Sequence, residues 1–390
     1  MQRIVISPRK DWQKKVEEIG FGFHTADTPY WNEGAMYKFT MNEVLEIEKA
    51  TGELWDMCLG AVQYVMDNDL YDKFCIPKWI IPHIEKSWEN DSPAIYGRFD
   101  FLLKDGVPKM LEFNADTPTS LFEGGVVQWY WLQDFDKSKD QFNSIHEKLI
   151  AYWKYLKPYL QHSLAVKPHP LYFTCLKETL EDLTTTEYLR DCAIQAGLET
   201  KLIYIDDIGW NEKKKVFVDL ENNEIFNIFK LYPWEFLVTE DFGKHIIEDK
   251  NAAFWIEPSW KMILSNKAIL PILWELYSEC PYLLPSHFDE SYHVDYVKKP
   301  ILSREGANIL IVKDGKQILK TEGQYAEGNA EFNQEAYIYQ EFCEVPSFDG
   351  NTPVIGSWVI GQQAAGMGIR ETATIVTDNF SRFVPHIIED

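Results

Sequence analysis

Apolar residues recur every three to four positions in the first part of the chain, a spacing typical of helices that pack one face on a core. The pattern is clearest over residues 41–69, where Gly52 predicts a break into two helices. Residues 77–85 contain two prolines and predict a turn that leads into a short helix. We therefore expect a mostly helical region over residues 1–90.

Alternation replaces this pattern between residues 94 and 114, where AIYGRFDFLL and PKMLEFN flank a Lys-Asp-Gly turn signal. Residues 126–160 are again helical in spacing. The runs LYFTCL, TTTEYLRDCAIQAGL and KLIYID predict a strand–helix–strand unit with a parallel pair. Strand-like runs EAYIYQEF, TPVIGSWVIG and TATIVTD follow, and GQQAAGMGIRE suggests a small-residue loop. This order predicts an α+β or mixed α/β fold with an antiparallel C-terminal part.

The two runs around the turn signal each have one polar face, because side chains alternate along a strand. Arg98 and Asp100 share that face in the first run, and Met110, Glu112 and Asn114 share it in the second. The polar faces coincide only if the connecting loop has an odd number of residues, so we expect a three-residue loop at 105–107. This register places Asp100 opposite Glu112 and Arg98 opposite Asn114.

Two opposed carboxylates repel each other and destabilise a strand pair, so a positive partner is expected. Asp100, Glu112 and the carbonyl of Asn114 form an all-oxygen set of the kind that Mg²⁺ prefers. Arg98 beside them can bind a phosphate or an oxyanion. Alternation alone leaves open an exposed hairpin with solvated charges.

Two lysines are candidates for binding nucleotide phosphates. Lys267 begins an apolar helix, and Lys299 lies on a strand that leads into the loop SREGAN. Backbone N–H groups of that loop, around Gly306 and Asn308, can bind phosphate oxygens. The loop is not a Walker A motif and holds one glycine, so a surface turn is the alternative.

Three further residues lie near the ends of predicted C-terminal runs. Gln340 and Glu341 end a strand-like run and are candidates for the hinge that hydrogen-bonds an adenine edge. Arg370 follows the small-residue segment and is placed either to clamp an acidic substrate or to form a surface ion pair.

Composition restricts the class of partner. The 390 residues contain 61 Asp and Glu against 38 Lys and Arg, a net charge of −23, which repels nucleic acids and attracts small cations such as polyamines. The six cysteines have no CxxC spacing, and the nine histidines do not cluster, so we expect free thiols and no zinc site. Without a signal segment or a run of ~18 apolar residues, we expect a cytoplasmic protein with no membrane or nucleic-acid partner.

Several long stretches carry a family resemblance. RFDF…GVPKMLEFNADTPTS, EPSWKMILSNKAILPILWEL, VKKPILSREGANI, EAYIYQEFCEVPSFDGN and GSWVIGQQAAGMGIRE together resemble the synthetase half of glutathionylspermidine synthase and its amidase-free relatives, the acid–amine ligases. The resemblance implies an ATP-grasp-like fold in permuted order. We expect one ligase unit with four approximate regions: helical (1–90), hairpin and helices (91–165), a small α/β lobe (166–250) and a nucleotide-binding part (251–390).

The resemblance also implies roles for the candidate residues. Asp100, Glu112 and Asn114 would bind Mg²⁺, and Arg98 would steady the tetrahedral centre. Lys267 and Lys299 would hold the phosphates of ATP, and Arg370 would meet the acid substrate or the transferred phosphoryl group.

Substrate residues are implied in the same way. Thr117 and Thr119 occupy the places of two family serines that touch the glycine of glutathione, and Glu187 matches one of a pair of acids that meet the polyamine. Ser303 replaces a family glycine, and no amidase domain precedes the ligase, so we expect no hydrolysis of the product.

The function that follows is an ATP- and Mg²⁺-dependent ligase that joins a peptide-like acid to a polyamine-like amine through an acyl phosphate. The alternatives are a small-acid kinase or ATPase, a nucleotide-binding protein without catalysis, and a glycoside hydrolase with paired carboxylates. The identity of the acid and of the amine, and the oligomeric state, stay open.

Overall fold

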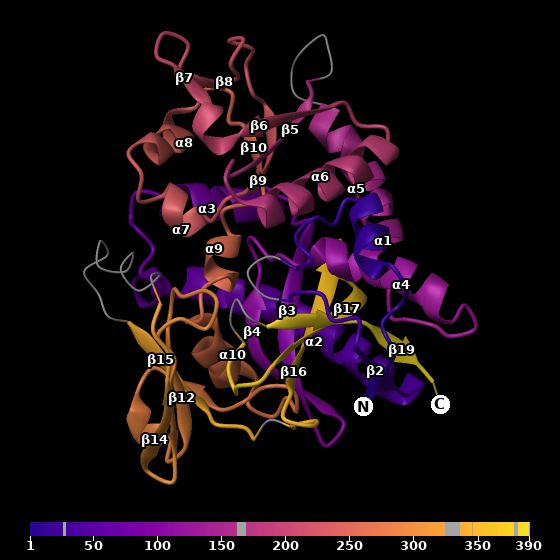
Figure 1. Ribbon diagram of the computed structural model, residues 1–390. Coiled ribbons are helices and arrows are strands. Elements are labelled where there is room, and N and C mark those ends of the chain that lie inside the picture. Colours follow the sequence, from indigo (N-terminus) through magenta and orange to yellow (C-terminus); the bar gives the residue numbers. More distant parts are fainter. Residues whose placement is uncertain (26–28, 162–168, 324–335, 345, 378–380, 390) are drawn as a thin grey trace.

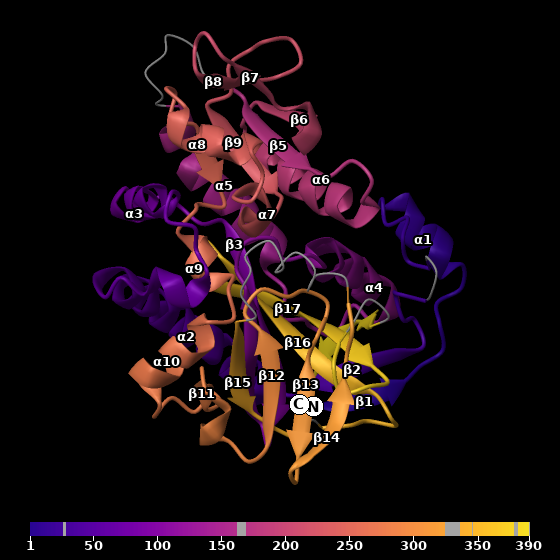
Figure 2. The same ribbon diagram turned by 90° about the vertical axis from the view of Figure 1, so that its left-hand side faces the viewer.

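A computed structural model describes residues 1–25, 29–161, 169–323, 336–344, 346–377 and 381–389. Three large sheets organise these residues, and they meet around one hairpin (Figures 1 and 2). The architecture is mixed α+β. Among the described residues, no helix has the length and the apolar character that crossing a lipid bilayer requires.

The central sheet is antiparallel and combines strands from distant parts of the chain. Its order is β18 (Arg382–Val384), β17 (Gln363–Thr372), β16 (Thr352–Ile360), β3 (Tyr96–Lys104) and β4 (Val107–Asn114). A smaller sheet beside it joins β1 (Gln2–Val5), β2 (Ala35–Phe39) and β19 (His386–Ile388). The two ends of the chain therefore lie close together (Figure 2).

One face of the central sheet is covered by the long helix α2 (Met41–Asp67). A capping box begins it, because the Thr40 hydroxyl accepts from the Glu43 N–H while the Glu43 carboxylate accepts from the Thr40 N–H. The predicted break at Gly52 is wrong. A helix-interior glycine costs only ~1 kcal/mol, and the apolar face of α2 offsets that cost by burial.

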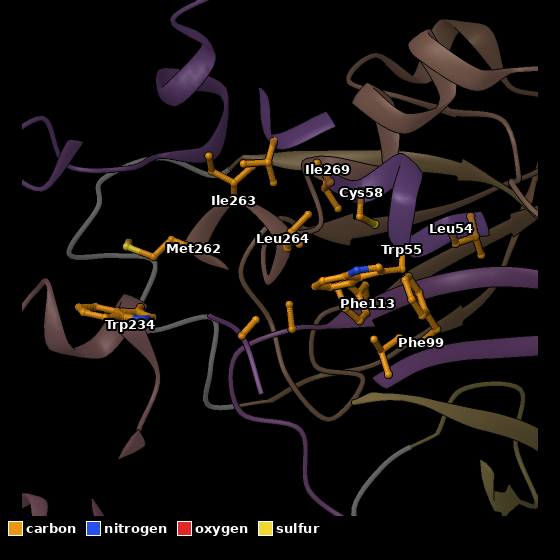
Figure 3. Close-up of a cluster of buried hydrophobic side chains, with 14 of the residues drawn as sticks. Leu54, Trp55, Cys58, Phe99, Phe113, Trp234, Met262, Ile263, Leu264 and Ile269 are labelled. Carbon is orange, nitrogen blue, oxygen red and sulfur yellow. The ribbon is translucent and has the colours of Figure 1, made fainter. Parts of the chain in front are cut away.

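Figure 3 shows how this core is built. Trp55 of α2 meets the edge of the Phe113 ring, and Phe113 stacks on Phe99 with ring centroids 4.0 Å apart. Each large apolar side chain removed from water contributes roughly 1.5–3 kcal/mol. The packing of α2 against the apolar face of the hairpin therefore holds the strands that carry the candidate active-site residues.

The other face of the sheet packs on the π-helical turn η2 (Glu123–Val127) and the helix α5 (Ile145–Gln161). The helix α4 (Gln128–Phe135) continues directly from η2. The other α-helices of this region are α1 (Trp12–Glu18) and α3 (Ile81–Glu89). α3 begins between the two prolines of the segment 77–85 and confirms the short helix predicted there.

A four-stranded parallel sheet forms the α/β lobe (Figure 1). Its order is β10 (Phe254–Ile256), β9 (Asn227–Leu231), β5 (Leu171–Cys175) and β6 (Thr200–Tyr204). Helix α6 (Leu180–Gln195) connects β5 to β6, which confirms the predicted strand–helix–strand unit. The chain leaves β5 toward β6 on one side and later returns to β9 on the other. This is the topological switch point at which open α/β sheets bind ligands.

The third sheet is antiparallel and lies beside the hairpin. Its strands are β11 (Ser286–His287), β15 (Tyr337–Glu341), β12 (Tyr296–Pro300), β13 (Leu310–Lys313) and β14 (Lys316–Lys320). Two helices, α9 (Lys261–Leu264) and α10 (Ile269–Tyr277), pack between the sheets.

The hairpin has the predicted register at its polar end but not the predicted loop. Lys104 pairs with Val107, so the turn has two residues, Asp105 and Gly106, both with positive φ. A β-bulge at Leu111 restores the even register between Phe101 and Asp100. Asp100 therefore does face Glu112. Because of the bulge, Met110 lies opposite Phe101 in the core and not on the polar face.

The segment GQQAAGMGIRE is not a loop, because it forms most of β17. Gly368 is required by close packing, since a Cβ there would lie 2.7 Å from the Phe383 ring. The run TATIVTD is not a strand. β17 ends at Thr372, residues 373–376 form bends, and Asp378 lies outside the described residues.

Candidate active site

The polar face of the hairpin brings two carboxylates together. The side-chain N–H₂ of Asn114 lies 3.3 Å from an oxygen of Asp100 and 3.3 Å from an oxygen of Glu112. Asp100 is buried, and Glu112 is partly exposed. The three candidate metal ligands thus converge on one point, as the sequence predicted from the strand alternation.

Cations from the hairpin itself and from three other segments neutralise these carboxylates. Arg98 binds both oxygens of Asp100, at 2.6 and 3.1 Å, and Arg370 reaches Asp100 from β17 at 2.9 Å. Lys267 lies 3.2 Å from Glu112. Burial alone would raise the pKa of Glu112, but Lys267 and Lys299 outweigh burial and lower it to about 2. Glu112 is therefore ionised at neutral pH.

One cavity, with about 790 Å³ of space that is partly open to solvent, extends from the hairpin toward the third sheet. Its far walls are apolar and include Leu284, Val297, Ile309 and Ile311; Glu341 and Gly306 also line it. This combination of an apolar pocket and a charged end is typical of a small-molecule site.

Lys299 lines the charged end of this cavity and is itself buried. Its ammonium donates to the backbone oxygen of Leu111 at 2.9 Å and to the side-chain oxygen of Gln340 at 2.7 Å. Burial lowers the pKa of Lys299 to about 8, against the attraction of Glu112. Gln340 also donates to the Met110 carbonyl, so its amide binds the hairpin and Lys299.

The loop after β12 approaches the hairpin through Lys267, which donates to the Ser303 carbonyl at 2.7 Å. Gly306 lines the cavity with a positive φ, and a Cβ there would lie 2.6 Å from the Thr377 carbonyl oxygen. Only glycine permits this close approach. Asn308 donates to Gly323 and is not among the residues that line the cavity.

A second cavity of about 1130 Å³, part of it open to solvent, borders the other end of the same polar face of the hairpin, at the switch point between β5 and β9, and shares Glu112 and Gly306 with the first cavity. Arg98, Arg370, Thr117 and Thr119 all line it. Arg98 also donates to the Thr119 carbonyl at 2.7 Å. The structure thus brings both threonines and both arginines to one cavity, although they come from distant parts of the sequence.

Two acids at the start of α6, Glu181 and Asp182, also line this cavity. Burial, together with Glu181, raises the pKa of Asp182 to about 6. Glu187, the acid singled out in the sequence, lies further along α6, pairs with Arg190 at 2.9 Å and is not among the lining residues. The sequence predicted a helix that begins at Thr184, but α6 begins at Leu180, four residues earlier. The prediction therefore left Glu181 and Asp182 outside the helix.

A third acid, Glu123, is buried near this cavity and was not singled out in the sequence. Its Oε1 accepts from the Tyr30 hydroxyl at 2.7 Å, and its Oε2 has no hydrogen-bond partner in the described part of the chain. Burial and the neighbouring Glu181 raise the pKa of Glu123 to about 8. Glu123 begins the π-helical turn η2, a feature often found at functional sites.

Arg304 was also missed and connects the loop after β12 to the α/β lobe. It pairs with Glu235 of α7 (Trp234–Leu237) and donates to the Thr117 hydroxyl at 2.9 Å. It is therefore placed to fix the loop relative to the second cavity.

The donor set at the hairpin fits Mg²⁺. Rotating the Asn114 amide by half a turn would bring its oxygen to the point where the Asp100 and Glu112 oxygens meet, and such amide orientations are interchangeable. In the described residues no three His, Cys, Asp or Glu side chains form a metal-binding group. A site with two carboxylates and an amide suits Mg²⁺, which usually keeps water and phosphate oxygens as its other ligands.

Comparisons with known proteins place this arrangement in a family. The family model described as glutathionylspermidine synthase preATP-grasp matches residues 3–389. A Haemophilus influenzae protein named "Putative acid–amine ligase" is 39% identical over 401 residues, covering 99% of both chains. The bifunctional glutathionylspermidine synthetase/amidase of Escherichia coli is 28% identical over 412 residues, which cover 97% of this chain and 63% of that protein.

A solved structure supports the fold independently. The glutathione synthetase-like effector GSS30 of Globodera pallida in its apo form superposes with a TM-score of 0.56 at 10% identity, covering 91% of this chain and 89% of that one. The predicted family resemblance is confirmed over the whole chain. The chain belongs to the glutathionylspermidine synthase preATP-grasp family.

Proposed function

We propose that this protein is an ATP-dependent ligase that activates a carboxylate as an acyl phosphate and joins it to an amine. One observation carries the proposal. The charged face of a single hairpin borders two neighbouring cavities. Lys267 and Lys299 line the apolar one, and the residues that line the other include Arg98, Arg370, Thr117, Thr119, Glu181 and Asp182. The names of the relatives, acid–amine ligase and glutathionylspermidine synthetase, agree with this reaction class.

The first cavity suits ATP. Its apolar walls would hold the base, and Lys267, Lys299 and the loop around Gly306 would bind the phosphates at the hairpin end. Asp100, Glu112 and Asn114 would hold Mg²⁺, which when bound neutralises charge on the phosphate oxygens. Glu341 lines the same cavity and remains the candidate for binding the adenine edge.

The acid substrate would enter from the second cavity. Thr117 and Thr119 can donate hydrogen bonds to it, and Arg370 can bind its carboxylate. An oxygen of this carboxylate attacks the γ-phosphorus, the bond from phosphorus to the bridging oxygen breaks, and ADP leaves. Arg98 and Arg370 lie beside Asp100, where charge develops, so positioning and electrostatics supply most of the catalysis.

The amine would approach past Glu181 and Asp182, whose carboxylates attract an ammonium group. Asp182 is the proton acceptor in this scheme, because a base with a pKa of about 6 is ionised at neutral pH and still takes up a proton readily. The amine nitrogen then attacks the acyl carbon, the bond to the phosphate oxygen breaks, and inorganic phosphate leaves. The substrate classes that fit are a peptide-like acid and a polyamine-like amine.

An ADP-release screen tests this function. Peptide-like acids, including γ-glutamyl peptides, are combined with polyamines and other amines, and the products are identified by mass spectrometry. A ligase releases ADP, phosphate and amide in equal amounts, and only when both substrates are present. Sustained ADP release with the acid alone, without an amide, would identify the protein as an acid kinase or ATPase and contradict the proposal.

A further inference from the structure

A separate cavity lies in the α/β lobe and plays no part in the proposed reaction. It encloses about 750 Å³, part of it open to solvent. Its walls come from the connection after β6, the strands β8 (Val216–Val218) and β10, and the segment from the end of β9 to α8 (His245–Glu248).

This lobe cavity shares a wall with the second active-site cavity. Leu231, Pro233 and Phe236 line the active-site side, whereas Tyr232 and Leu237 line the lobe side. The same segment thus presents alternate residues to two different spaces, and the two cavities are neighbours without being continuous in their lining.

The interior of the lobe cavity is aromatic. Phe217 and Trp255 are buried and pack edge to face with ring centroids 5.4 Å apart, and Phe242 meets Phe217 at 5.9 Å. Ile208 and Ile246 complete the apolar walls. Such an interior favours an alkyl chain and disfavours a sugar or a phosphate.

The charged side chains that line the cavity in the described part of the chain are both carboxylates. Asp206 and Glu240 are exposed at its edge, and the Tyr232 hydroxyl donates to Glu240. In the part of the chain that the structure describes, no lysine, arginine or histidine lines the cavity. Nearby Lys244 pairs with Asp241, outside the lining. The charge at the entrance is therefore negative over an aromatic interior.

We propose that the lobe cavity binds a primary alkylammonium ion, with its ammonium group against Asp206 and Glu240 and its chain against Phe217 and Trp255. Carboxylates and aromatic faces both attract an ammonium group, and the apolar interior contributes through burial of the chain. A second charge at the far end of the chain would be buried without a partner, so a monoamine binds more tightly than a diamine of equal length. This is a site for amines distinct from the acids Glu181 and Asp182.

Isothermal titration calorimetry without ATP tests the proposal with n-hexylammonium, 1,6-diaminohexane and hexanoate as probes. The variant is Asp206→Asn with Glu240→Gln, in which the glutamine still accepts from Tyr232. The matched control is Asp207→Asn with Asp241→Asn, which makes the same change of net charge at neighbouring positions outside the lining.

We expect n-hexylammonium to bind the wild type more tightly than the other two probes. Its affinity falls about tenfold or more in the variant and stays within about twofold in the control. Equal affinity in the variant, equal losses in both double substitutions, or equally tight binding of hexanoate would each overturn the proposal. No outcome depends on ligase activity, so a failure here is distinct from a failure of the proposed function.

Discussion

The two cavities beside the hairpin hold their charges in opposite ways. The nucleotide side is the cavity that Lys267 and Lys299 line, and the acceptor side is the cavity that Glu181 and Asp182 line, together with the nearby Glu123. On the nucleotide side each carboxylate has a cation close by, and Glu112 has a pKa lowered to about 2. On the acceptor side Glu123 is buried and Asp182 is partly buried, both beside Glu181, and their pKa values are raised to about 8 and about 6. One side therefore maintains fixed charges for binding a charged ligand, and the other side holds acids that can exchange protons near neutral pH.

Removing a charged group from the nucleotide side should reduce activity more than any other change. Glu112→Ala removes one of the two carboxylates that would hold Mg²⁺, so we expect ADP release to fall ~10³-fold or more, about 4 kcal/mol in activation free energy. The fold should persist because the substitution also removes the repulsion with Asp100. Glu344→Ala, an exposed residue paired with Lys313, is the control. Wild-type turnover in Glu112→Ala, measured alongside circular dichroism, would rule out the metal assignment.

Lys299→Met should weaken nucleotide binding by about 10- to 100-fold, since one hydrogen bond to a charged group contributes roughly 1.5–3 kcal/mol. Lys298→Met is the matched control, because Lys298 is the next residue on β12 and lies over the Tyr337 ring. ATP affinity is measured by equilibrium binding. The same affinity in both variants would remove Lys299 from the nucleotide site.

Asp182, on the acceptor side, should determine how the rate of amide formation depends on pH. Asp182→Asn should lower amide formation by about 10- to 100-fold while acid-dependent phosphoryl transfer persists. In the wild type the rate should fall below a pH of about 6, as Asp182 becomes protonated, and the variant should lose that limb. Stopped assays for amide and for hydroxylamine-trapped acyl phosphate separate the two steps.

Glu187→Gln is the comparison that sharpens this result. The structure places Glu187 in a surface pair with Arg190, so the substitution should leave amide formation within about twofold of the wild type. If Glu187→Gln is the more damaging of the two, then the acid chosen from the sequence is the functional one and the assignment to Asp182 is wrong.

The same contrast explains how much of the site was predictable. Asp100, Glu112 and Asn114 follow from strand alternation, which is local, and the register survives because the bulge at Leu111 compensates for the shorter turn. Lys267 and Lys299 stand out because charged residues beside apolar runs are conspicuous.

The acceptor side could not be predicted in this way. Glu181 and Asp182 precede the first clear helical repeat, so the helix appeared to begin after them. Glu123 lies in an irregular turn, and its raised pKa depends on burial by segments as distant as Tyr30. The fold shows the same division. The βαβ unit is local and was predicted, whereas the pairing of β3 with β16 joins residues more than 250 positions apart.

The smallest expected effect is on stability, and it tests the acceptor side without any substrate. The pKa of Glu123 is about 8 in the folded protein and near its ordinary value of 4.5 when unfolded. Between these values the folded state retains a proton that the unfolded state releases, so raising the pH through this window reduces the free energy of unfolding. Glu123→Gln removes this pH-dependent loss. The free energy of unfolding of the variant minus that of the wild type should therefore rise by at least ~1 kcal/mol between pH 5 and pH 8.5.

Tyr30→Phe provides the opposing variant. The Tyr30 hydroxyl donates to the carboxylate and so lowers the pKa of Glu123, against burial. Removing it should raise that pKa further and extend the loss of stability to higher pH. Urea unfolding at several pH values, read as differences between variants, separates the two effects. If the stability difference between Glu123→Gln and the wild type does not vary with pH, Glu123 is not a protonated buried acid, and the contrast between the two cavities would rest on Asp182 alone.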